Sequence, residues 1–138
     1  MSDSSLVPGL SAELERTVGD ADTATSLGSG DVPVLATPRL VAWLEAATVA
    51  ALAGALPEGS TSVGTRVDVE HRTASPVGAR VRLAASVSHV DGRLVRLEVA
   101  ATHGDGAVVA AGTVTRVVVD RARFLARLSP PEPTPPRA

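Results

Sequence analysis

The chain has 138 residues, which is one domain's worth of sequence and enough to bury a hydrophobic core. Its formal net charge is −2, without a long block of one sign, and aromatic residues are almost absent, so neither charge nor base stacking points to a nucleic-acid partner. The lack of cysteine excludes disulfides and thiolate metal sites. With no signal peptide and no long uninterrupted apolar run, we expect a cytoplasmic protein that does not enter the membrane.

The first predicted element is a strand, because Leu10, Ala12 and Leu14 alternate with polar residues up to about Gly19. A loop rich in Gly, Ser and Pro follows over residues 26–36.

A long helix is predicted to begin at Thr37 and Pro38, since threonine is a good N-cap and proline is favoured in the first turn. Gly54 and Pro57 mark its end. The helix is apolar nearly all round, which is typical of a buried helix. Glu45, in its middle, is therefore out of place.

After the helix the pattern changes to period two, which indicates strands. Turn signals separate them at Ser75–Gly78, Asp91–Gly92 and Gly104–Gly106. The predicted strands cover residues 62–73, 81–87, 95–99 and 107–120. The last of these is apolar on both faces and is expected to be central. A short helix over 121–128 and a proline-rich, disordered tail over 129–138 complete the chain.

One strand, one apolar helix and four further strands predict an α+β fold in which an antiparallel five-stranded sheet wraps around the helix, the hotdog fold. We expect residues 1–128 to form this single domain. One helix covers only part of such a sheet, so a homodimer that joins two sheets edge to edge, or a dimer of dimers, is predicted.

Three polar residues lie where the pattern predicts apolar surroundings: Thr37, Glu45 and His71. Each has a structural explanation. Thr37 could serve only as an N-cap, and His71 could be a hydrogen-bonded core residue. Glu45 could reach solvent, or pair with Arg39 of a second copy.

Taken together, a hydroxyl, a carboxylate and an imidazole are the parts of an acyl-transfer site. An imidazole activates a hydroxyl or a water, and a carboxylate orients the imidazole. The other histidines, His89 and His103, lie next to turns and are expected at the surface, and Asp68 and Glu70 occupy the polar phase of their strand.

The segments "DVPVLATPRLVAWLEAA" and "GTRVDVEHRTASPVG" resemble the fluoroacetyl-CoA thioesterase family of the hotdog superfamily over roughly residues 10–128. The resemblance implies an acyl-CoA thioesterase that works as a homodimer, without metal or cofactor. It implies a catalytic set of Thr37, Glu45 and His71, with either Thr37 or Glu45 delivering the attack. It also implies that Gly64 lines the acyl pocket.

The fluoroacetyl enzyme of that family carries phenylalanines in the loop before the helix, whereas "TATSLGSGDVPVLA" has none. We therefore expect a small or medium acyl chain rather than fluoroacetate. Arg72, Arg80 and Arg82 are candidates to bind the phosphates of CoA. The alternative is a hotdog module that binds an acyl thioester without reaction, or has a structural or regulatory role. A dehydratase is disfavoured because the chain has no Asp-x-Asn-x-x-His pattern.

Overall fold

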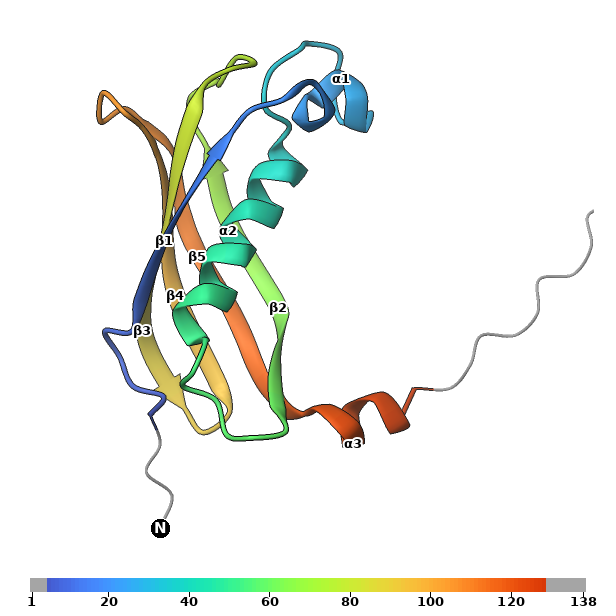
Figure 1. Ribbon diagram of the computed structural model, residues 1–138, viewed down its shortest axis with the longest axis vertical. Helices are drawn as coiled ribbons and strands as arrows, with labels where there is room; N and C mark the ends of the chain where they lie inside the picture. Colours follow the sequence, from blue (N-terminus) through green and yellow to red (C-terminus); the bar gives the residue numbers. More distant parts are fainter. Residues whose placement is uncertain (1–4, 129–138) are drawn as a thin grey trace, which may run out of the picture.

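One long helix lies against a strongly curved antiparallel sheet in the computed structural model of the protein, which describes residues 5–128 (Figure 1). The predicted tail at 129–138 lies outside the described residues. In chain order the elements are β1 (Ser11–Thr17), η1 (Asp20–Asp22), α1 (Ala24–Leu27), α2 (Thr37–Leu52), β2 (Ser60–His71), β3 (Arg80–Asp91), β4 (Leu94–His103), β5 (Val108–Asp120) and α3 (Arg121–Ala126). The two short helices η1 and α1 were not predicted.

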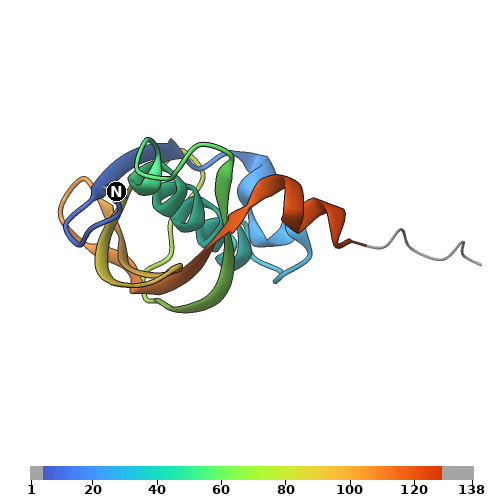
Figure 2. The same ribbon diagram turned by 90° about the horizontal axis from the view of Figure 1, so that it is seen from below.

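The sheet has the strand order β1-β3-β4-β5-β2, and all neighbouring strands are antiparallel. Seen from below, it curves around α2 (Figure 2). The predicted α+β arrangement of a sheet wrapped around one helix is thus confirmed. Strand β5 lies between β4 and β2, as its apolar character predicted, and β1 and β2 form the edges.

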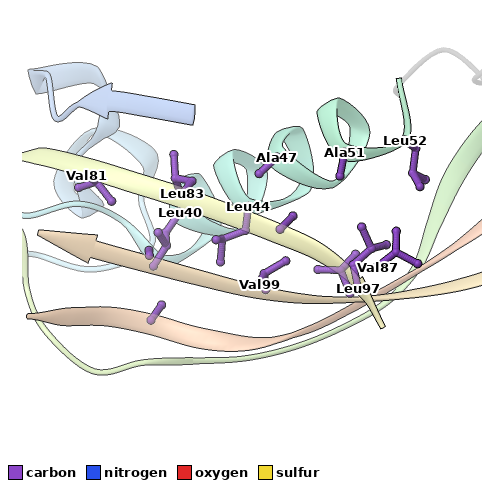
Figure 3. Packing of buried hydrophobic residues seen from close by; sticks show 14 of the residues in the cluster. Leu40, Leu44, Ala47, Ala51, Leu52, Val81, Leu83, Val87, Leu97 and Val99 are labelled. Carbon is purple, nitrogen blue, oxygen red and sulfur yellow. The ribbon is translucent and has the colours of Figure 1, made fainter. Parts of the chain in front are cut away.

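The core is the layer between α2 and the inner face of the sheet (Figure 3). Leucine, valine and alanine fill it, because the chain has almost no aromatic residues. The buried residues of α2 are Leu40, Leu44, Ala47, Thr48, Ala51 and Leu52.

The prediction that α2 is a buried helix is confirmed for one face of the helix only in the single chain. Ala42 is exposed and Val49 is 50 % exposed, because the sheet covers only one side of the helix. At the β2 edge, Val67 is also 39 % exposed, although it lies on the apolar phase of its strand. An apolar helix face and an unpaired strand edge are therefore open in this chain.

Among the described residues, no helix combines the length and the apolar character needed to cross a membrane.

Candidate active site

The first two predicted site residues, Thr37 and His71, are in direct contact. The Oγ1 atom of Thr37 lies 2.8 Å from Nδ1 of His71, which is hydrogen-bond distance. The N-cap of α2 is Ala36, and Thr37 is its first helical residue. The interpretation of Thr37 as an N-cap is therefore wrong, because its hydroxyl bonds the imidazole and not a backbone N–H.

The fold explains this contact. Helix α2 begins at the end of the molecule where β2 ends (Figure 1), so the first residue of the helix lies beside the last residue of the strand. In the register of the sheet, His71 is opposite Ala110 of β5. Across the next strands, Ala110 is opposite Ala101 of β4, and Ala101 is opposite Leu83 of β3; all three are buried. His71 thus occupies the inner phase of its strand, as predicted.

The imidazole is half-buried, whereas Thr37 is exposed. Burial lowers the pKa of His71 below its ordinary value, and the nearby backbone of Thr73 opposes part of that effect. The second ring nitrogen, Nε2, is buried and completes no hydrogen bond with any residue of the described part of the chain. The ring therefore favours the neutral form, with Nδ1 in contact with the Thr37 hydroxyl and Nε2 unpartnered within the described residues.

A pocket of about 300 Å³ opens next to this pair. Thr37, His71 and Arg72 form one wall, and residues of the segment before α2 form the other. The side chains from that segment are small or aliphatic: Ala24, Ser29, Val32, Val34 and Leu35.

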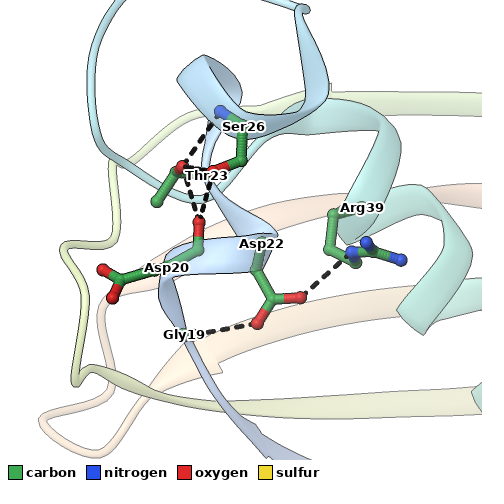
Figure 4. A network of polar contacts seen from close by, with 6 residues as sticks. All are labelled: Gly19, Asp20, Asp22, Thr23, Ser26 and Arg39. Atoms are coloured by element: carbon green, nitrogen blue, oxygen red, sulfur yellow. Dashed lines mark hydrogen bonds and ion pairs between the residues drawn. The ribbon is translucent and has the colours of Figure 1, made fainter.

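Polar contacts hold that segment in place (Figure 4). The hydroxyl of Thr23 donates to the carbonyl of Asp20 at 2.8 Å and accepts from the N–H of Ser26. Asp22 accepts from the N–H of Gly19 at 2.9 Å and forms an ion pair with Arg39 of α2 at 3.0 Å. The pocket wall is thus tied to the helix that carries Thr37.

The third predicted residue, Glu45, lies in a second polar cluster. Its carboxylate is 3.6 Å from Nη1 of Arg116, a residue of β5 that is only 7 % exposed. Arg116 donates from Nε to the hydroxyl of Ser62 at 2.8 Å and from Nη2 to the Ser62 carbonyl at 3.1 Å. Burial lowers the pKa of Arg116, and the charge of Glu45 opposes that shift. Within the chain the partner of Glu45 is therefore Arg116, and Arg39, which was suggested to pair with Glu45 of a second copy, forms an ion pair with Asp22.

Gly64 lies directly against this carboxylate. A Cβ atom at position 64 would be 2.6 Å from Oε2 of Glu45, so any other residue would displace the side chain. Strand β2 also has a register shift between Gly64 and Arg66. Glycine is needed here for close approach to Glu45.

Within one chain the two clusters are separate. Glu45 comes eight positions after Thr37 on α2, which corresponds to about 12 Å along the helix axis. His71 comes seven positions after Gly64 on β2, which corresponds to roughly 20 Å of strand. The structure brings Thr37 to His71 and Glu45 to Gly64.

Of the three arginines suggested for CoA, only Arg72 borders the pocket, and its Nε pairs with Oε1 of the exposed Glu70 at 2.9 Å. Arg80 lies at another hollow and Arg82 is exposed on β3. His89 is exposed as predicted. The prediction for His103 is wrong, because this residue is half-buried and its Nε2 lies 2.7 Å from Oγ of the fully buried Ser75.

Sequence reasoning missed Arg116 and Ser62. The available signal was the alternation of Val114, Arg116 and Val118, which places an arginine on the inward phase of a central strand. A buried charge of this kind needs a partner, and Glu45 was the unexplained carboxylate. In residues 5–128, no three side chains of His, Cys, Asp or Glu gather as a metal site would require.

Known proteins of the same architecture define the class of this chain. Over 88 % of its length it matches the fluoroacetyl-CoA thioesterase FlK, with 29 % identity, 94 % of that chain covered and a TM-score of 0.82. A thioesterase superfamily member from Thermus thermophilus matches 87 % of the chain with 28 % identity, 88 % of its own length and a TM-score of 0.81. A hot-dog-like protein from Thermanaerovibrio acidaminovorans matches 89 % with 27 % identity, 90 % of its own length and a TM-score of 0.81.

The protein has the hotdog fold and is a thioester hydrolase. More narrowly, the model of the family described as fluoroacetyl-CoA-specific thioesterase matches residues 18–122, and the chain belongs to this family. Among curated protein sequences none matches the chain.

Proposed function

We propose that the protein hydrolyses the thioester of a small or medium acyl-CoA, with Thr37, His71 and Glu45 as its catalytic residues. The observation that carries this proposal is the 2.8 Å contact between the Thr37 hydroxyl and Nδ1 of His71 beside a pocket. The pocket supports a short acyl group, because aliphatic side chains line it and it measures about 300 Å³.

In this proposal the neutral imidazole of His71 accepts a proton at Nδ1 as the Thr37 oxygen, or a water beside it, attacks the thioester carbonyl carbon. The C–S bond then breaks and the thiolate of CoA leaves with the proton that His71 took up. If Thr37 is the nucleophile, a water molecule later cleaves the acyl-threonine ester by the same proton path, and the products are the free acid and CoA. N–H groups at the start of α2 are candidates to stabilise the developing oxyanion.

Glu45 requires a second copy of the chain in this scheme. Antiparallel pairing of two β2 edges, centred near Val67, would place His71 of one copy close to Ser62 and Gly64 of the other, on the same face of a continuous sheet. The carboxylate beside Gly64 would then approach the Thr37–His71 pair of the neighbouring copy. The exposed Val67 and the open β2 edge support such a homodimer.

There Glu45 could orient His71 or activate water. Arg116 acts as a positioning residue, because its buried guanidinium fixes the carboxylate from the side of the sheet.

The direct test uses the purified protein and a panel of acyl-CoAs of increasing chain length, with free CoA detected by mass spectrometry. We expect turnover to be fastest with short and medium chains and to fall for long ones, because the pocket is small. Fluoroacetyl-CoA is included with acetyl-CoA as its control, and no marked preference between them is expected. Release of CoA at the background rate for every member would refute the proposal.

The pH profile provides a separate prediction. Because burial lowers the pKa of His71, the neutral base persists to lower pH than it would in a free histidine. On the acid side, kcat/KM should therefore lose half of its value at a pH below 6.5, the ordinary pKa of histidine. Steady-state rates between pH 4.5 and pH 8, as an approximate range, would show this limb. An acid limb centred above 6.5 would contradict the assignment of His71 as the base.

A further inference from the structure

Three arginines line a further hollow, of about 210 Å³, at the α3 end of the molecule, opposite the end where α2 begins and β2 ends (Figure 1). Arg93 comes from the turn between β3 and β4, and Arg123 and Arg127 come from α3 and the residue after it. Phe124 also lines the hollow and is half-buried. Val119 and Asp120, at the end of β5, complete the lining.

The three guanidinium groups supply the positive charge of this hollow. None of them forms an ion pair with a residue of the 5–128 segment. Asp120 is the one acidic residue lining the hollow, and its Oδ1 accepts from the backbone N–H of Arg123 at 2.9 Å as the cap of α3. The hollow is therefore positive, with an aromatic side chain in its lining.

This combination suits a nucleotide that carries several phosphates. Arginine binds phosphate oxygens with paired, directional hydrogen bonds, and an aromatic ring offers a face on which a base can stack. We infer that Arg93, Arg123, Arg127 and Phe124 bind the phosphorylated adenosine end of CoA, an inference that rests on the acyl-CoA substrate proposed above.

The distances along the chain fit this assignment. Arg116 lies beside Glu45, and Asp120, which lines the hollow, comes four positions later on β5. The distance between the two residues is about 13 Å along the strand. The pantetheine arm of CoA spans about thirteen bonds from sulfur to the first phosphorus, or about 15 Å when extended like a peptide chain. A thioester near Glu45 could therefore place its nucleotide at these arginines.

The proposed dimer adds a second reason. Within each chain, Ser60 of β2 is opposite Asp120 of β5. The proposed antiparallel pairing of two β2 strands would bring Ser60 of one copy opposite the segment just after His71 of the other copy. The arginines of one copy would then lie near the pocket of its neighbour. Arg80 and Arg82, by contrast, are on β3, which β4 and β5 separate from β2.

The test is the double variant Arg123→Gln/Arg127→Gln of the full chain. We expect KM for an acyl-CoA to rise about tenfold or more with little change in kcat, because the lost contacts lie far from the reacting carbonyl. With the corresponding acyl-pantetheine, which has no nucleotide, the variant and the wild type should have the same KM. The control Arg16→Gln/Arg96→Gln removes the same charge from exposed positions on β1 and β4 and should leave both values unchanged.

Calorimetry with adenosine 3′,5′-bisphosphate separates this inference from the proposed reaction. Binding that the double variant loses supports the nucleotide site even if no acyl-CoA is hydrolysed. Equal KM values for variant and wild type with acyl-CoA, or a larger effect of Arg80→Gln/Arg82→Gln, would overturn the inference while leaving hydrolysis intact. Inorganic phosphate that competes as well as the bisphosphate would also overturn it, since the site would then attract any anion.

Discussion

Replacement of His71 by alanine is expected to lower kcat/KM for acyl-CoA hydrolysis by about 10²–10⁴-fold, the usual contribution of a positioned general base. The Nδ1 atom of the imidazole contacts the Thr37 hydroxyl directly, and Nε2 has no hydrogen-bond partner among the described residues. Removal of the imidazole therefore leaves the hydroxyl without a proton acceptor. Steady-state kinetics with the best substrate of the panel would measure the loss.

The matched control is His89→Ala, which removes the same side chain from an exposed position on β3. Its rate should equal that of the wild type. Thermal unfolding followed by circular dichroism would show that both variants remain folded. A folded His71→Ala protein with wild-type kcat/KM would remove His71 from the reaction.

Mixing two inactive variants should restore activity if each site uses residues of two copies. In a heterodimer of His71→Ala and Glu45→Gln chains, one site receives both substitutions and the other receives neither. With random exchange of subunits, half of the dimers are mixed and each has one intact site of two, so about a quarter of the wild-type rate is expected. Co-expression of the two chains, followed by purification through different tags, would isolate the mixed dimer for assay.

The same measurement separates the two possible arrangements. If His71 and Glu45 acted within one chain, every site in the mixture would carry one substitution and the rate would stay at the level of the single variants. Light scattering coupled to size exclusion gives the mass of the particle, and a monomer would rule out the shared site. Glutamine is used at position 45 because it keeps the shape of the side chain beside Arg116 and Gly64 while removing its charge.

Much of the fold could be read from local patterns. The change from helical spacing to period two near residue 60 separated α2 from the strands, and Gly54, which has a φ of +81°, ended the helix as predicted. The order of these elements then left few ways to bury one apolar helix. The short helices η1 and α1 were missed because their hydrogen bonds depend on Thr23 and Asp22, in a segment whose composition indicates only a loop.

The candidate site was predicted less completely. His71 stood out because it breaks the apolar phase of its strand, and Glu45 because it interrupts an apolar helix, and both features are visible in a linear sequence. Arg116 shows the same signal but was overlooked, since three valines follow it and the strand reads as apolar on both faces.

The sequence by itself determined the long helix and the five strands, the inward phase of His71 and the types of chemical group available, because these depend on spacing over a few residues. Only the tertiary structure decided which groups meet. It joined Thr37 to His71, 34 residues apart, and Glu45 to Arg116. Such pairs depend on where α2 crosses the sheet and on strand register, and packing of the whole core sets both.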